Sequence, residues 1–263
     1  MSWRSYLTLA RLARRRLASY ADYVSFQRQQ ARMLNEYLEQ HDISLHQRHV
    51  LDLGSGLGGY ALEWRACGGR VVTLDLATAS PVVREAGIPF LRSDAQRLPF
   101  VSETFDVVFC ASLIEHVSQP EWLLSEVRRV LRSGGVCYLS FPPFYSPRGG
   151  HEFSPFHYLG EKAALKLARR DRNIAGWLRD YYDIPSSARS FAETYTGWGL
   201  YRVTIAQARR WIRRAGFSVR HFGTRYLPVN LAAVPVLGEV LAWHVQMILV
   251  KSNCPPNVTL HSA

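Results

Sequence analysis

Short apolar runs alternate with amphipathic segments over the middle of the chain. Five runs have the length of buried strands: HVLDLG (49–54), RVVTLDL (70–76), FLRSD (90–94), FDVVFCAS (105–112) and GVCYLSF (135–141). Their continuous apolar character is typical of strands covered on both faces, as in parallel sheets. The segments between them carry apolar residues at helical spacing. The clearest is 120–135, which ends in Ser-Gly-Gly, a helix end and turn. This alternation predicts an open parallel sheet with helices on both faces.

The alternation of strand-like and helix-like segments stops on either side of this region. Residues 3–40 precede it and have the periodicity of two amphipathic helices. Residues 142–203 follow it and are rich in proline, glycine and aromatic residues. A helix over 204–216 and two strands, near 217–226 and 243–251, complete the pattern. We therefore expect an α/β fold with a seven-stranded, mostly parallel sheet, an N-terminal helical extension and an inserted helical lid.

The chain is strongly basic, with a formal net charge of +11 over 263 residues. Such a charge favours an anionic partner: nucleic acid, an acidic or phosphorylated substrate, or a membrane surface. A basic surface that is only solvated remains open. The four cysteines are spread singly, so neither a zinc-binding pair nor a disulfide framework is predicted. We expect a reducing, cytoplasmic location.

Two segments bear on membrane association. Residues 3–20 contain five arginines and no acid, without the apolar core of a secretory signal. We expect one of three roles for this helix. It lies on an anionic membrane, namely the inner membrane surface, or it covers the substrate cleft. The third alternative is that it packs on the core with an arginine-rich outer face. Residues 227–250 hold one charge, Glu239, but Pro228 and Pro235 interrupt them. They predict a loop or short helix and a buried strand instead of a membrane span.

The stretch LDLGSGLGGY (51–60) contains G-x-G-x-x-G, a pattern often found in dinucleotide-binding loops. Asp52 lies two residues before the first glycine, where its carboxylate would repel the pyrophosphate of a dinucleotide. Asp75 ends the second strand, where a carboxylate accepts hydrogen bonds from ribose hydroxyls of either kind of cofactor. Asp94 ends the third strand, where it is placed to accept from the exocyclic amine of adenine.

Taken in order, VLDLGSGLGGY, VVTLDL, RSDAQRLPF, FDVVFCASLIEHV and LRSGGVCYLSFP resemble the class I S-adenosylmethionine-dependent methyltransferases, closest to the type 11 small-molecule branch. The resemblance covers roughly residues 48–142 and implies a Rossmann-like core that binds S-adenosylmethionine. It also implies methyl transfer by direct displacement. The expected organisation is an N-terminal helical part, the cofactor-binding core, an inserted lid for acceptor recognition, and a C-terminal part that completes the core (1–45, 46–142, 143–203 and 204–263).

The resemblance implies cofactor-binding roles for ten residues: Asp52, Gly54, Ser55, Gly56, Asp75, Leu76, Asp94, Ala95, Ala111 and Ser112. The first four would form the loop against the methionine part. Asp75 would hold the ribose hydroxyls, and Leu76 would lie on the adenine. Asp94 and Ala95 would contact the adenine edge. The last two would border the methyl group. Asp52 would order the loop or attract the cofactor's ammonium, and the loop reads best as D-x-G-x-G-x-G, with Gly58 as third glycine.

Two alternatives remain at this point: a cofactor-binding protein without turnover, and an NAD(P)-dependent oxidoreductase. On the acceptor side, His116 is a candidate general base or positioning residue after the fourth strand. His151 is a second candidate base. The pattern H-E-x5-H formed by His151, Glu152 and His157 is not a helical metal motif, so we predict no metal.

The lid carries ten aromatic residues that would line an acceptor cleft or form the lid's own core: Phe144, Tyr145, Phe153, Phe156, Tyr158, Trp177, Tyr181, Tyr182, Tyr195 and Trp198. With the basic segment 161–172 they favour a small-molecule, lipid-linked or glycan acceptor, methylated on oxygen or carbon. Nucleic acid is disfavoured, because the Pro-Pro-Phe sequence follows the fifth strand, and Phe141 precedes it in place of a polar residue. The sequence does not predict the oligomeric state.

Overall fold

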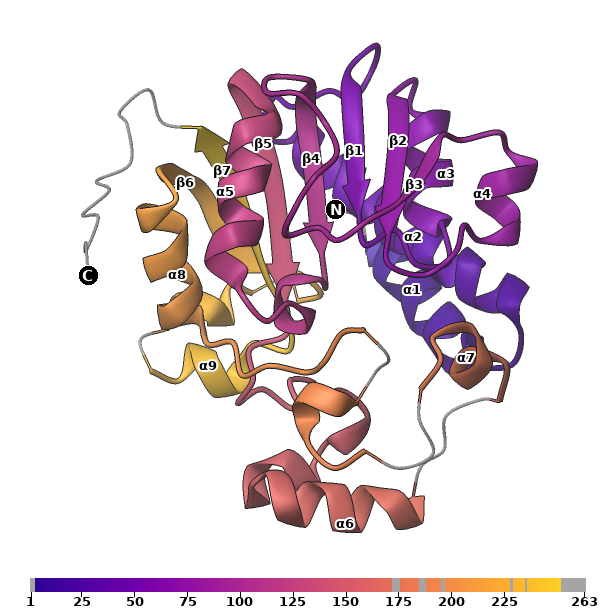
Figure 1. The fold of residues 1–263 in the computed structure, drawn as a ribbon, viewed down its shortest axis with the longest axis vertical. Helices are drawn as coiled ribbons and strands as arrows, with labels where there is room; N and C mark the ends of the chain where they lie inside the picture. The colour runs from indigo at the N-terminus through magenta and orange to yellow at the C-terminus, as the bar shows by residue number, and fades with distance from the viewer. Residues whose placement is uncertain are drawn as a thin grey trace.

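A seven-stranded sheet lies at the centre of the molecule, in the order β3-β2-β1-β4-β5-β7-β6 (Figure 1). The computed structural model describes residues 3–171, 176–184, 188–194, 197–227, 229–234 and 236–251. The strands are β1 (His49–Leu53), β2 (Arg70–Asp75), β3 (Phe90–Arg92), β4 (Phe105–Ala111), β5 (Leu131–Phe141), β6 (Phe217–Thr224) and β7 (Val245–Lys251). Neighbouring strands from β1 to β5 pair in parallel, and β7 is antiparallel to both β5 and β6. The predicted seven-stranded, mostly parallel sheet is confirmed.

Helices cover both faces of this sheet. The described helices are α1 (Trp3–Arg15), α2 (Tyr20–Glu39), α3 (Gly59–Ala66), α4 (Pro81–Glu85), α5 (Pro120–Val130), α6 (Glu161–Asp171), α7 (Gly176–Tyr181), α8 (Ile205–Arg214) and α9 (Gly238–Leu241). The short 3-10 helices are η1 (Ile114–His116), η2 (His151–Phe153), η3 (Phe156–Leu159), η4 (Phe191–Glu193) and η5 (Leu231–Ala233). On one face α5 and α8 bury residues such as Val127 and Ile212. On the other, α2 and α3 bury Leu34 and Trp64, whose ring stacks on Phe109 of β4 at 4.1 Å.

The end of α5 differs from its prediction. The helix ends at Val130, and β5 begins at once at Leu131, so Ser-Gly-Gly is not a turn but part of the strand. The cause is a shift in the pairing of β4 with β5, which leaves several β5 residues bulged around Gly134, at φ +73°. Arg132 in this bulge holds the Asp106 carboxylate of β4 at 3.0 Å.

The lid, defined as residues 143–203, has its described parts beyond the carboxyl ends of β1, β4 and β5 (Figure 1). It has a small core of its own, built from residues such as Phe153, Leu165 and Leu200. In parallel sheets ligands bind at this edge. The lid therefore covers the edge of the sheet that should hold the site.

The two membrane-related segments fold as follows. The first helix ends at Arg15 and packs on α2; it buries Leu9, whereas Trp3 and Leu7 are 71% and 57% exposed. Residues 227–250 form η5, α9 and the buried strand β7, as predicted, with Pro228 and Pro235 outside the described residues. In the part of the chain that the structure describes, no helix is long and apolar enough to cross a membrane.

Candidate cofactor and acceptor site

The glycine loop connects β1 to α3. Gly54, Gly56 and Gly58 have φ values of +67°, +49° and +81°, a region that side chains with a Cβ rarely occupy. A Cβ on Gly56 would lie 2.8 Å from the Tyr182 hydroxyl, so the loop also needs glycine for space. Gly59 begins α3 and packs against α2, which agrees with the reading of Gly58 as the third loop glycine.

Asp52 lies in β1 beneath this loop and is buried. Burial, together with the nearby charge of Asp75, raises the pKa of its carboxyl group to about 8. Its Oδ2 atom has no hydrogen-bond partner among the described residues. A buried carboxylate oxygen without a donor is unusual in a folded chain. It fits the ammonium group of a methionine moiety, which would supply both the positive charge and the missing donors.

Asp75 ties the loop to the end of β2. Its Oδ2 accepts from the Gly56 amide at 2.8 Å, and its Oδ1 accepts from the Ala77 amide at 2.9 Å. Leu76, the predicted adenine contact, is 37% exposed beside it. Asp75 is thus at the expected place, and its contact with the ribose stays a prediction.

Asp94 and Ala95 follow β3. The Asp94 Oδ1 accepts from the Gln96 backbone amide at 2.8 Å, and the Gln96 side-chain amide lies 3.2 Å from both carboxylate oxygens. The Ala95 side chain packs in the hydrophobic core. Their contact with adenine likewise stays a prediction.

Ser112 follows Ala111, the last residue of β4, and has φ +55°. Its hydroxyl lies 2.9 Å from Nε2 of His244, which burial and the charge of Arg225 keep neutral by lowering its pKa well below the usual value. Arg225 is also buried, and donates to the Ser140 hydroxyl at 3.2 Å. Sequence reasoning missed His244 and Arg225, because only the antiparallel β6–β7 pair brings them to the ends of β4 and β5.

The lid aromatic residues divide into two groups. Phe153 and Phe156 belong to the lid's own core. Tyr181 instead donates to the Gly56 carbonyl at 2.8 Å, and Trp177 donates to the Leu17 carbonyl at 3.1 Å. The α7 region therefore lies on the cofactor loop and the N-terminal helices. Tyr195 lies outside the described residues.

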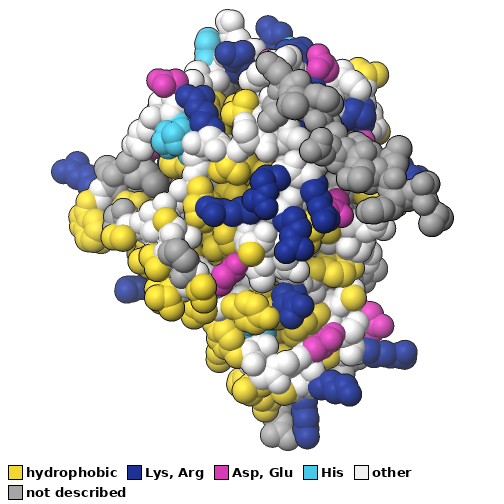
Figure 2. Space-filling model, turned by 90° about the vertical axis from the view of Figure 1, so that its left-hand side faces the viewer, with side chains coloured by type: hydrophobic (Ala, Val, Ile, Leu, Met, Phe, Trp, Pro, Cys, Tyr) yellow, Lys and Arg dark blue, Asp and Glu magenta, His cyan; other side chains and the backbone are white. Residues whose placement is uncertain are grey.

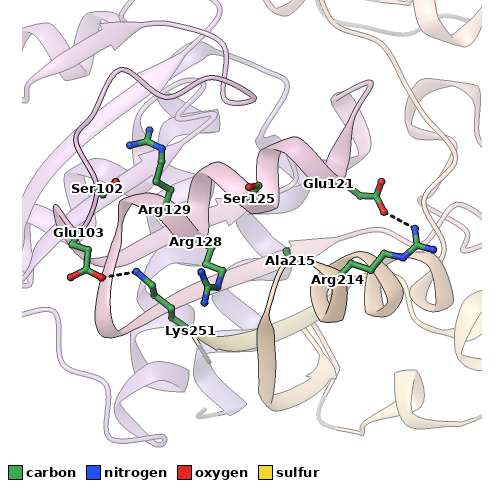
Figure 3. A pocket seen from close by; sticks show the side chains of 9 residues that line it. All are labelled: Ser102, Glu103, Glu121, Ser125, Arg128, Arg129, Arg214, Ala215 and Lys251. Carbon is green, nitrogen blue, oxygen red and sulfur yellow. Dashed lines mark hydrogen bonds and ion pairs between the residues drawn. The ribbon is translucent and has the colours of Figure 1, made fainter. Parts of the chain in front are cut away.

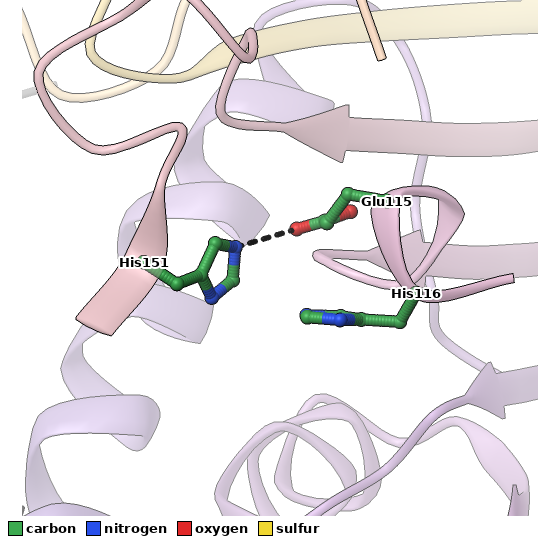
Figure 4. A group of neighbouring side chains, drawn as sticks. All are labelled: Glu115, His116 and His151. Atoms are coloured by element: carbon green, nitrogen blue, oxygen red, sulfur yellow. Dashed lines mark ion pairs between the residues drawn. The ribbon is translucent and has the colours of Figure 1, made fainter. Parts of the chain in front are cut away.

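Glu115 and His116, which are buried, and His151, which is partly buried, form a cluster between η1 and the lid (Figure 4). Nδ1 of His116 lies 2.8 Å from the Gly199 carbonyl, and burial and the nearby His151 lower the pKa of His116 well below its usual value. Burial alone would also lower the pKa of His151, but the charge of Glu115, at 3.6 Å, outweighs this and raises it. The two histidines predicted as candidate bases thus lie together, beyond the carboxyl end of β4.

A surface groove of about 500 Å³ lies elsewhere, between α5, α8 and the end of β7 (Figure 3). Lys251 and Arg214 in it are paired with Glu103 and Glu121, both at 2.9 Å. Glu103 precedes β4, so the groove is at the amino end of that strand, away from the glycine loop. It does not belong to the site.

The carboxyl edge of the sheet thus carries a glycine loop, an unpartnered buried carboxylate and an acid at the end of β2. This arrangement fits an S-adenosylmethionine-dependent methyltransferase, and comparisons with known proteins show that family. Residues 51–139 match the model of a methyltransferase domain. An uncharacterized methyltransferase of Mycolicibacterium paratuberculosis is 31% identical over 211 residues, which is 77% of this chain and 76% of the relative. The chain belongs to this methyltransferase family and uses S-adenosylmethionine.

Solved structures confirm the fold. An S-adenosylmethionine-dependent methyltransferase from Mesorhizobium loti is 19% identical, with a TM-score of 0.55 over 81% of this chain and 95% of that one. The [4+2]-cyclase SpnF is 17% identical, with a TM-score of 0.51 over 84% of this chain and 80% of its own. Since a cyclase shares the fold, the architecture alone does not define the reaction. The sequence relatives supply the methyltransferase assignment, which displaces the oxidoreductase alternative.

Proposed function

We propose that this methyltransferase acts on an anionic amphiphile at a membrane surface and methylates a hydroxyl oxygen or a carbon of it. The observation that carries the proposal is an exposed apolar surface around η5 and α9. Its residues are 39% to 85% exposed: Val229, Val234, Val236, Leu237, Val240, Leu241 and Trp243. Figure 2 faces this side of the molecule and shows hydrophobic side chains gathered below a belt of lysines and arginines. Exposed apolar surface of this kind is typical of partner or membrane contacts.

This apolar surface adjoins the lid. The Arg148 guanidinium of the lid lies 5.7 Å from the ring centre of Trp243, and Tyr158 and Leu159 of the lid are also exposed. A tryptophan beside an arginine suits the boundary between lipid chains and anionic headgroups. An amphiphile held there would be near the carboxyl edge of the sheet.

The α1 helix is a second candidate membrane contact. Trp3 and Leu7 are exposed on a helix whose sequence contains arginines and no acid. Basic helices with exposed apolar residues bind anionic lipid surfaces. Peripheral membrane association through this helix is part of the proposal.

Arg225 supports an anionic acceptor. It is buried near the ends of β4 and β5, among the rings of Tyr60, Tyr138 and Tyr226, and no described carboxylate forms an ion pair with it. A buried cation without a counter-charge is unfavourable. A carboxylate or phosphate of the acceptor would supply that charge.

The chain's own residues perform binding and alignment. S-adenosylmethionine supplies an activated methyl group when bound. Asp52 would hold its ammonium, Asp75 its ribose, and the lid would exclude water from the reacting atoms. His116 and His151 would contact the acceptor. Alignment of acceptor and methyl carbon can provide much of the rate enhancement.

Transfer of isotopically labelled methyl groups tests the proposal. The full chain is incubated with labelled S-adenosylmethionine and with separate lipid, aqueous metabolite and nucleic-acid fractions, and products are identified by mass spectrometry. We expect the label in an anionic lipid or lipid-linked product. Label confined to aqueous or nucleic-acid products would overturn the proposed acceptor. Cofactor binding without product from any fraction would favour the non-catalytic alternative.

A further inference from the structure

The cluster of Glu115, His116 and His151 has the composition of a metal site. One donor atom of each residue lies within 4.8 Å of those of the others (Figure 4). Glu115 and His116 come from η1 at the end of β4, whereas His151 begins η2 in the lid. The cluster therefore joins two parts of the chain that sequence motifs do not connect.

The Glu115 carboxylate lacks the partners that burial demands. Its side chain is 2% exposed, and neither of its oxygens has a hydrogen-bond partner among the described residues. Nε2 of His151 is also buried without a hydrogen-bond partner, at 3.6 Å from Oε1 of Glu115. The carboxylate oxygen and the imidazole nitrogen are both buried, yet they are too far apart to form a hydrogen bond with each other. An ion bound between them would satisfy both atoms.

His116 is oriented in the way that metal-binding histidines are. The Gly199 carbonyl can only accept, so Nδ1 of His116 carries the proton and donates at 2.8 Å. Nε2 then carries the lone pair of the ring. Such a hydrogen bond from the second nitrogen to a carbonyl fixes the tautomer and ring plane of metal-bound histidines. The ring also meets that of His151 edge-on, with centres 4.7 Å apart.

We propose that Glu115, His116 and His151 bind a divalent transition-metal ion, with zinc as the first candidate. Two imidazoles and one carboxylate form a donor set that suits such ions and leaves positions open for a ligand. Donor atoms around zinc lie about 3.3 Å apart, so the distances between the donor atoms of the three residues must shorten by up to about 1.5 Å when the ion binds. Because His151 is in the lid, its side chain can supply this movement.

The site would complete the acceptor side of the reaction. An acceptor hydroxyl bound at the open position would lose its proton to solvent more readily, and its oxygen would then attack the methyl carbon as the carbon–sulfur bond breaks. The ion would also hold the lid to the core, where the Tyr201 amide already donates to the Glu115 carbonyl at 2.8 Å. This catalytic role rests on the proposed function, but metal binding does not.

Metal analysis of the full-length protein tests the site without any acceptor. The protein is stripped with a chelator, loaded with Zn²⁺ or Co²⁺, freed of excess ion and analysed by mass spectrometry. We expect about one ion per chain, and a visible Co²⁺ spectrum that Zn²⁺ abolishes. Glu115→Gln and His151→Ala should lower the affinity on the order of 100-fold or more, since each removes a ligand.

His157→Gln is the matched control, because His157 is a buried histidine of the same lid outside the cluster. It should keep both the metal and the Co²⁺ spectrum. Binding of S-adenosylhomocysteine shows that each variant retains a folded core. Absence of metal from the loaded wild-type protein, or equal loss in His157→Gln, would overturn the assignment. Because no acceptor is used, failure here leaves the proposed methyl transfer unaffected.

Discussion

At the scale of single residues, burial changes the acidity of the Asp52 carboxyl group. The sequence places it before the glycine loop, but not its degree of burial. In the folded chain its pKa is raised to about 8, so Asp52 is largely protonated at pH 7. A cationic group bound beside it favours the ionised form.

Cofactor binding should therefore release a proton. At pH 7 we expect release of about 0.9 proton per site, and an affinity that rises with pH toward 8. The same pKa shift has the opposite effect on folding stability, which decreases with pH where cofactor affinity increases. A raised folded pKa means that stability contributed by this group falls as pH rises from about 4 to 8. Calorimetric titration of S-adenosylhomocysteine in buffers of different ionisation enthalpy measures the release.

Asp52→Asn is expected to abolish proton release and weaken binding. Asp94→Asn is the control, because that exposed acid should affect affinity without altering the proton count. Absence of proton release from the wild-type protein between pH 6 and 8 would contradict the role of Asp52.

Gly56 allows a second test at this scale. Gly56→Val should raise the dissociation constant of the cofactor at least about tenfold, because a β-branched residue is strained at φ +49° and its Cβ would crowd Tyr182. Gly87→Val imposes similar strain at φ +60°, but nothing lies within 4 Å of the added Cβ. It should lose stability by a similar amount and keep normal affinity in calorimetry. Equal affinities of the two variants would refute the loop assignment.

At the scale of elements, α7 is the part of the lid that bears on cofactor entry. The hydrogen bond from Tyr181 to the Gly56 carbonyl joins it to the glycine loop. No local pattern predicts this contact, since the two residues are 125 positions apart. The aromatic content of the lid predicted its importance, but did not separate the residues of its core from those that cover the loop.

Tyr181→Phe should make the lid open more easily. Loss of one hydrogen bond, about 0.5–1.5 kcal/mol, corresponds to roughly 2- to 10-fold faster association of S-adenosylhomocysteine in stopped-flow experiments. Tyr158→Phe removes a comparable lid hydroxyl, which donates to the Tyr145 carbonyl at 3.1 Å, away from the loop. That control should leave the rate unchanged. An unchanged rate in Tyr181→Phe as well would show that α7 does not control entry.

At the scale of the whole molecule, the net charge of +11 and the exposed apolar surface around η5 and α9 bear on the choice of partner. The charge alone favours any anionic surface. Exposed Leu237 and Trp243 add the apolar contact that distinguishes a lipid surface from a nucleic acid. The two features together make membrane binding testable apart from catalysis.

Leu237→Ser combined with Leu241→Ser should reduce binding to anionic phospholipid vesicles about tenfold, as measured by cosedimentation. Both side chains are exposed, so folding should be unaffected. Val101→Ser, which changes an exposed apolar residue before β4, is the control and should bind normally. Binding that is equal in all three proteins would argue against this surface as the membrane contact.

The sequence by itself determined the seven-stranded, mostly parallel sheet, which depends on local signals: apolar runs and helical periodicity. The class of cofactor followed from the resemblance of five motifs, in order along the chain, to a known family. The sequence pattern failed at Ser133–Gly135, which form a bulge within β5 instead of a turn between the helix and the strand.

Only the tertiary structure decided which distant side chains meet. It brought His151 of the lid to Glu115, and Tyr181 to the glycine loop. It also brought His244, which directly precedes β7, to Ser112. The physical reason is that such contacts depend on how the lid and the antiparallel end of the sheet fold back over the parallel strands. Burial then raised the pKa of Asp52 and left the Glu115 carboxylate without a hydrogen bond from the described residues; no pattern along the chain records either effect.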